Sequence, residues 1–115
     1  MTSVEAPDLD PRVIDRIVEL LVDAAKPRRI ILFGSYARGE QTRDSDLDLL
    51  VTEDAISNLA HEQVRLRRAL ACIDMPIDVL VFAERDLETP QRWLGTAVYD
   101  ALRDGKELYA ADQRR

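Results

Sequence analysis

The chain has 115 residues, which suits one compact domain over residues 1–115 with a modest core and leaves no room for a second. Its formal charge is -6, from 16 Lys and Arg against 22 Asp and Glu, and this excess of negative charge disfavours direct binding of nucleic acid. Residues 1–11 are acidic, and nowhere do roughly 18 apolar residues follow one another, so we expect neither export nor a membrane span but a cytoplasmic protein.

The first part of the chain predicts a helix followed by a strand. Asp10 and Pro11 are typical of an N-cap and a first helical residue, and apolar residues then recur at helical spacing until Pro27. Residues 29–33 form a short run rich in residues that favour strands.

A glycine turn leaves this strand. We expect the side chain of Ser35, which follows Gly34, to cap a short helix that ends at Gly39. Backbone N–H groups at a helix start, with a serine hydroxyl beside them, form an anion site, and glycine lets a phosphate group approach closely. An ordinary capped turn is the alternative, and it is compatible with phosphate binding because both use the same geometry.

The rest of the chain continues the alternation of strands and helices. Residues 46–51 predict a second strand and residues 76–82 a third, and between them we expect a helix over residues 59–73 that Ser57 caps. A last helix is expected over residues 89–105. Together these elements predict an α/β fold with a sheet of at least three strands.

Strand geometry sorts the strand residues onto two faces, because successive side chains alternate. One face is apolar, and we expect helices to cover it; its members are Leu47, Leu49, Val51, Ile77, Val79 and Val81. The other face carries Asp46 and Asp48 at the start of the second strand and Asp78 near the start of the third. Three carboxylates should therefore converge on the face that the helices leave open.

These carboxylates are the candidate metal site. Asp46 and Asp48 lie about 7 Å apart along the strand, and two like charges in so apolar a run repel each other unless a cation lies between them. Asp78 lies in the most continuously apolar strand, where an ionised carboxylate needs a cation or several donors. Such a trio suits two Mg²⁺ ions about 3.5 to 4 Å apart, which polarise an attacking hydroxyl and neutralise a leaving pyrophosphate.

Each candidate residue also has a structural interpretation. Asp46 and Asp48 can lie at a solvated strand end with Arg38 or Arg43 as ion-pair partners. Asp78 can accept hydrogen bonds from backbone amides at a strand start. Arg38, one turn after the serine, can contact phosphate, orient Asp46 or form a surface ion pair.

The motifs of the chain resemble those of the minimal nucleotidyltransferases of the DNA polymerase β superfamily. The likeness lies in Gly-Ser-Tyr-Ala-Arg-Gly at 34–39, Ser-Asp-Leu-Asp-Leu-Leu-Val at 45–51 and Ile-Asp-Val-Leu-Val at 77–81, and it extends over nearly the whole chain. It implies a single-domain nucleotidyltransferase fold, with a small mixed β-sheet, helices packed on one face and an open active-site face.

The resemblance also implies a reaction. Gly34 and Ser35 would bind the β- and γ-phosphates of ATP, with Arg38 beside them. Asp46 and Asp48 would ligate both Mg²⁺ ions, and Asp78 the ion that activates the acceptor hydroxyl. AMP would pass to that hydroxyl and pyrophosphate would leave. In this family the acceptor is often a tyrosine of a small helical HEPN ribonuclease, which is silenced, so that the transferase is the antitoxin of a bacterial toxin–antitoxin pair.

Two other functions stay open at the level of sequence. The chain can be a non-catalytic antitoxin that neutralises its toxin by binding alone, although the intact carboxylates count against this. It can also be a nucleotidyltransferase that acts on a small molecule or a nucleic acid, although the short chain and the negative charge count against that. A homo-oligomer or hetero-oligomer is compatible with each function.

Overall fold

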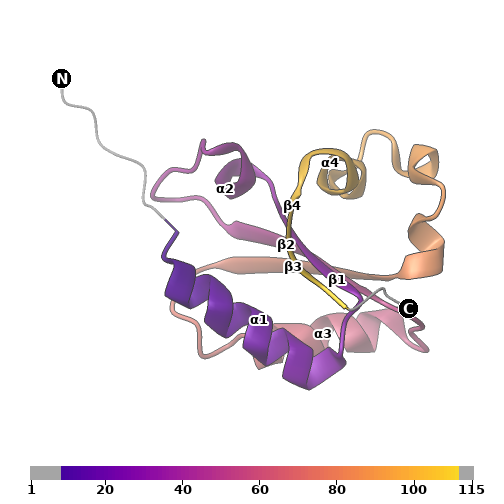
Figure 1. The fold of residues 1–115 in the computed structure, drawn as a ribbon, viewed down its shortest axis with the longest axis horizontal. Helices are drawn as coiled ribbons and strands as arrows, with labels where there is room; N and C mark the ends of the chain where they lie inside the picture. Colours follow the sequence, from indigo (N-terminus) through magenta and orange to yellow (C-terminus); the bar gives the residue numbers. More distant parts are fainter. Residues whose placement is uncertain (1–8, 112–115) are drawn as a thin grey trace.

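The computed structural model describes residues 9–111, which form one sheet with helices on both sides (Figure 1). None of the helices in this range is long and apolar enough to cross a membrane. In chain order the elements are α1 (Pro11–Ala25), β1 (Arg29–Phe33), α2 (Ser35–Arg38), β2 (Leu47–Glu53), α3 (Leu59–Ala69), β3 (Ile77–Ala83), the 3₁₀ helices η1 (Glu84–Leu87) and η2 (Pro90–Trp93), α4 (Ala97–Asp104) and β4 (Lys106–Ala110).

The sheet is mixed and has the strand order β3-β2-β1-β4. β1 pairs antiparallel with β2 and with β4, whereas β2 and β3 are parallel and are joined through α3. The predicted mixed sheet of at least three strands is thereby confirmed. The sequence-based prediction lacks β4, because Lys-Glu-Leu-Tyr-Ala is half polar and gains its strand conformation by pairing with β1.

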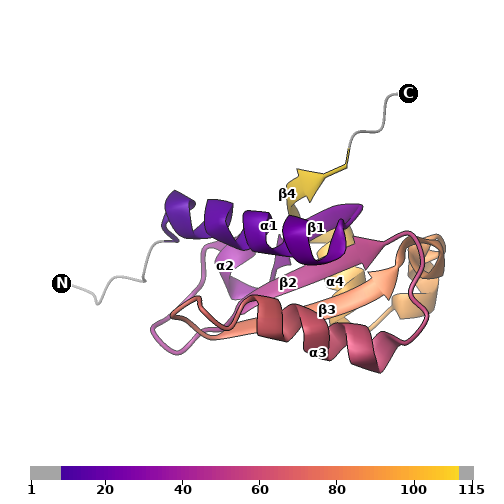
Figure 2. The same ribbon diagram turned by 90° about the horizontal axis from the view of Figure 1, so that it is seen from below.

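One face of the sheet carries the larger core, and α1 and α3 cover it (Figure 2). Leu47, Leu49 and Val51 of β2 are fully buried there, and Ile17 and Leu21 of α1 belong to the same cluster. The predicted alternation is confirmed, since Leu50, between Leu49 and Val51, belongs to the cluster on the opposite face.

The opposite face is covered in part by α4 and the 3₁₀ helices, whereas the prediction placed helices on one face only. Leu50, Leu80 and Phe82 belong to a second apolar cluster there. The ring of Trp93 packs edge-on against Phe82, with 4.9 Å between ring centroids. These strand side chains need burial because they are apolar. The open face is thus restricted to the starts of β2 and β3.

The helix α3 begins and ends at residues other than the expected ones, whereas α1 begins as predicted. Asp10 caps α1 as predicted. The N-cap of α3 is Asn58, whose side chain accepts a backbone N–H, and not Ser57. This helix ends at Ala69 rather than at Ile73. Asn58 is the better cap because its carboxamide oxygen lies where the first free amides of the helix point.

The expected helix over residues 89–105 is interrupted. Gly95 has a φ of 82°, in the left-handed region, and it separates η2 from α4. Thr96 then caps α4, and its side chain accepts the backbone N–H of Tyr99. The break lets α4 turn back over β1, which positions it beside the candidate site.

Candidate active site

The turn after β1 holds the predicted glycine–serine pair. Gly34 is the N-cap of α2, with φ 77° and ψ -157°, and Gly39 ends that helix in the left-handed conformation. Ser35 is therefore the first helical residue and not the cap that we expected. Within residues 9–111 the Ser35 hydroxyl makes no hydrogen bond, so it is not committed to the backbone there.

Gly34 lies directly against the carboxylate of Asp48. Phe33, which precedes it, is the register partner of Asp48 in the antiparallel pair of β1 and β2. A Cβ atom at position 34 would overlap Oδ2 of Asp48, and the positive φ disfavours any L side chain there. The turn and this carboxylate form one unit, and position 34 must be glycine.

The other two predicted carboxylates lie close to Asp48. Asp78 is its register partner in the parallel pair of β2 and β3, so both side chains leave the same face of strands that are about 4.8 Å apart. Asp46 lies one residue before β2. The negative charges of Asp78 and Asp46 both act on Asp48. The structure thus brings all three aspartates to the same end of the sheet.

This surplus of negative charge affects Asp48 most. Partial burial is the largest cause that raises the pKa of Asp48 above its ordinary value of 3.8, followed by the charges of Asp78 and Asp46. Arg38 lowers the pKa but does not outweigh the other three causes. The ionised form of Asp48 is therefore poorly compensated by the part of the protein that the structure describes.

The structural interpretation of Asp78 finds little support. Its side chain is 54% exposed, and the nearest cation is Arg67, with Nη2 3.9 Å from Oδ1. Across residues 9–111, no backbone amide donates a hydrogen bond to this carboxylate. Asp78 consequently faces solvent, in a position to meet a ligand.

The donor set fits Mg²⁺, a hard cation that prefers carboxylate oxygens. Among the residues described here, no three His, Cys, Asp or Glu side chains are already close enough to enclose a metal ion. Asp46 and Asp78 are exposed, so their carboxylates can rotate toward Asp48 without disturbing the core. The unfavourable charge at Asp48 and the oxygen chemistry suit a cation, and the metal ligands stay a prediction.

Arg38 lies at the end of α2, where its Nε donates to Oε1 of Glu40 at 2.8 Å. The ion pair is exposed, with more than half of each side chain accessible, so it contributes little stability. The charge of Arg38 also acts on Asp48 and Asp100. Arg43, the other candidate partner, forms no ion pair within the described range.

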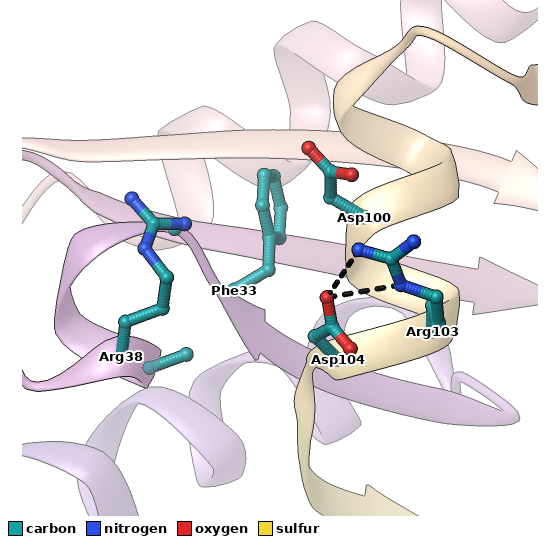
Figure 3. A pocket seen from close by; sticks show the side chains of 7 residues that line it. Phe33, Arg38, Asp100, Arg103 and Asp104 are labelled. Carbon is teal, nitrogen blue, oxygen red and sulfur yellow. Dashed lines mark hydrogen bonds and ion pairs between the residues drawn. The ribbon is translucent and has the colours of Figure 1, made fainter.

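A pocket of about 190 Å³ adjoins the turn on the side of α4 (Figure 3). Phe33 lies between Arg38 of α2 and the side chains of Asp100, Arg103 and Asp104 of α4. Nε and Nη2 of Arg103 donate to Oδ2 of Asp104 at 3.1 and 2.9 Å. The sequence carries no signal for these α4 residues, because only the packing of α4 on β1 brings them to the turn.

Comparison with known families identifies one whose model fits this chain. The model, described as a nucleotidyltransferase domain, matches residues 14–76, which is more than half of the chain. The matched stretch contains the glycine–serine turn, Asp46 and Asp48, and it ends just before β3.

The chain is also similar to individual proteins. Protein adenylyltransferase MntA of Shewanella oneidensis is 33% identical over 101 residues, which cover 86% of this chain and 66% of MntA. A relative from Methanocaldococcus jannaschii is 56% identical over 36 residues, which cover 31% of this chain and 36% of that protein. The chain thus spans less than two thirds of the length of these relatives.

Solved structures share the fold. A crystal structure of a toxin–antitoxin with AMP-PNP matches with a TM-score of 0.64 and 26% identity, over 87% of this chain and 75% of the other. The structure of a tri-AMPylated Shewanella oneidensis HEPN toxin in complex with MNT antitoxin matches with a TM-score of 0.60 and 20% identity, over 90% and 74%. At that identity the second match shows the fold alone. The α/β fold expected from the sequence is confirmed.

Proposed function

We propose that this chain, which belongs to the nucleotidyltransferase domain family, transfers AMP from ATP to a tyrosine hydroxyl of a HEPN-type toxin and so acts as the antitoxin of a toxin–antitoxin pair. Two similarities support the proposal. MntA, 33% identical, is a protein adenylyltransferase, and the 26% identical structure is a toxin–antitoxin with AMP-PNP, an analogue of ATP. The choice of a tyrosine follows from the resemblance of the motifs to those of minimal nucleotidyltransferases.

The triphosphate would bind along the turn between β1 and α2. Gly34 lets a phosphate group approach the backbone, and the hydroxyl of Ser35, at the start of α2, can donate to a phosphate oxygen. Arg38 would leave Glu40 to reach a phosphate, which costs little because that ion pair is exposed.

The carboxylates would handle the metal and the acceptor. Asp46 and Asp48 would hold both Mg²⁺ ions, and Asp78 would hold the ion beside the acceptor. When bound, Mg²⁺ neutralises phosphate charge and makes the acceptor hydroxyl easier to deprotonate. Asp78 is exposed and can orient that hydroxyl and take its proton. The hydroxyl oxygen would form a bond to the α-phosphorus, the bond from that phosphorus to the β-phosphate oxygen would break, and pyrophosphate would leave.

The contact between Gly34 and Asp48, with Asp78 as the register partner of Asp48, is the observation that carries the proposal. A glycine turn without carboxylates would suit many nucleotide-binding proteins, and a carboxylate pair without the turn would suit many cation sites. Their direct contact instead suits a reaction in which phosphate and metal must meet.

Incubation with Mg²⁺, ATP and a HEPN-type toxin tests the proposal, with the label on the α-phosphate in one reaction and on the γ-phosphate in a parallel one. We expect the toxin to gain the α-label and not the γ-label, and EDTA to prevent the transfer. Inhibition of the toxin without transfer of label would instead support the antitoxin that acts by binding alone. Label on an RNA or a small molecule, with none on protein, would support the third function.

A further inference from the structure

A second hollow adjoins β3, on the face opposite to the one that carries the Asp78 side chain. It is a groove of about 260 Å³ between the end of α3 and the first half of β3. It is lined by the apolar residues Leu70, Ile73, Met75, Ile77 and Val79 and by Arg67, and its exposed surface is polar and apolar in about equal parts. We call this hollow the α3–β3 groove.

The α3–β3 groove adjoins the proposed acceptor side of the site, from the opposite face of β3. Ile77 and Val79, which line it, are the two neighbours of Asp78 in β3. Arg67 connects the two, because it lines the groove and its Nη2 lies 3.9 Å from Oδ1 of Asp78. Since β3 is an edge strand of the sheet, a bound chain can pass around this edge from the groove to Asp78.

Within residues 9–111, a side chain covers the half of this edge that lies beyond Asp78. The side-chain amide of Gln63 donates to the carbonyl of Val79 and accepts the backbone N–H of Val81 at 3.2 Å. Gln63 thereby occupies the edge of β3 beyond Asp78 and protects it from pairing with another strand. The half that adjoins Asp78 is bordered by the α3–β3 groove instead.

Positive charge beside the α3–β3 groove favours an acidic partner. Arg67 and Arg68 are exposed at the end of α3, in a chain whose formal charge is -6. The ion pair of Arg67 with Asp78 is long, and the side chain of Arg67 is 60% exposed. An acidic side chain of a partner could therefore replace this contact, which would also leave Asp78 available to an acceptor.

We propose that the α3–β3 groove binds the polypeptide segment that carries the accepting hydroxyl. An apolar side chain near the accepting residue fills the groove, and an acidic side chain of the same segment pairs with Arg67, so that the hydroxyl lies over Asp78. This inference rests on the proposed function, because it assigns the acceptor of the same site.

Two synthetic peptides test the charge. Each contains one tyrosine followed by leucine, and they differ only in whether the flanking residues are glutamate or lysine. For each peptide, the rate of labelling from Mg·ATP is measured at a low concentration of the peptide. We expect the parent to favour the acidic peptide about tenfold and Arg67→Glu to reverse the preference. The ratio of the two rates cancels any effect of the substitution on Asp78. Arg92→Glu is the control, because it changes the net charge equally at an exposed position of η2.

A second pair of variants tests the apolar part. Ala71 lines the groove and is exposed, so Ala71→Trp can fill the groove without disturbing the core. Ala60→Trp is the control, at an exposed position near the other end of α3. We expect Ala71→Trp to lower labelling of the acidic peptide at least about tenfold, with unchanged binding of Mg·ATP, and Ala60→Trp to leave both unchanged.

The outcomes separate the two proposals. A parent protein that does not bind Mg·ATP would overturn the proposed function. A parent that labels the HEPN-type toxin but labels both peptides equally, or labels neither peptide, would overturn the groove assignment alone. An unchanged preference in Arg67→Glu, or full labelling by Ala71→Trp, would do the same.

Discussion

Glu53, at the end of β2, shares a hydrogen bond with Glu62 of α3, although both side chains are carboxylic acids. Glu53 is only 8% exposed. Burial, the hydrogen bond to Glu62 and the charge of Glu62 raise the pKa of Glu53 to about 8. Arg65 holds Glu62 ionised, with Nε and Nη2 donating to its two oxygens at 3.0 and 2.7 Å. At neutral pH, Glu53 is therefore the protonated partner that donates to Glu62.

This pair makes folding stability depend on pH. The folded state holds a proton on Glu53 up to pH about 8, whereas the unfolded chain releases it near 4.5. The contribution of Glu53 is thus fully present below pH 4.5 and is lost as the pH rises to about 8. We expect Glu53→Gln to raise the free energy of unfolding relative to the parent by about 1 kcal/mol or more at pH 8, and by less at pH 5.

Urea unfolding at several pH values between 5 and 8 checks this expectation. Glu19→Gln is the control, because Glu19 is an exposed residue of α1 whose loss should leave the pH profile unchanged. Parallel profiles for the parent and Glu53→Gln would show that Glu53 has an ordinary pKa.

Replacement of Gly34 by alanine should impair both stability and activity. The added Cβ atom would push the carboxylate of Asp48 aside, and the positive φ adds backbone strain. Gly39→Ala is a matched control, since Gly39 also has a positive φ but has nothing within 4 Å of its Cβ position. We expect both variants to lose about 1 kcal/mol for the backbone strain, and only Gly34→Ala to lose Mg·ATP binding. Equal binding by the two variants would contradict the importance of the Asp48 contact.

Substitution of Asp48 by asparagine should separate stability from activity. The change removes a half-buried charge whose pKa is raised by burial and by two like charges, so we expect the free energy of unfolding without Mg²⁺ to stay equal or to rise. Transfer of AMP should be lost, because a metal ligand is removed. Thermal unfolding with EDTA and with Mg²⁺ is the measurement, and the stabilisation by Mg²⁺ should be smaller in Asp48→Asn. A variant with the transfer rate of the parent would contradict the metal assignment.

Loss of the Gln63 side chain should weaken the edge of β3. Gln63→Ala leaves the carbonyl of Val79 and the N–H of Val81 without this partner, and we expect a cost of about 1 to 3 kcal/mol in the free energy of unfolding. Gln91→Ala, at an exposed position of η2, should cost almost nothing. Light scattering should also show more self-association of Gln63→Ala, because its strand edge is uncovered. Equal stability of the two variants would show that water replaces the amide.

Features that depend on neighbours in the chain could be predicted before the structure was known. Leu49 and Leu50 point to opposite faces because strand side chains alternate, whatever packs on them. Asp10 caps α1 because a short acidic side chain can accept a hydrogen bond from an amide two residues ahead. The position of the three aspartates on one face followed from the same local rule.

Contacts between distant segments could not be predicted in this way. β4 is a strand because the edge of β1 offers it hydrogen bonds, and α4 borders the turn because Gly95 redirects the chain over the apolar side of the sheet. The overlap that requires glycine at position 34 arises from Asp48, and the raised pKa of Glu53 arises from its burial against Glu62. Each of these four features depends on which surfaces meet in the folded chain. An apolar or polar surface can gain free energy by contact with many different partners, so the sequence of one segment does not determine which partner it meets.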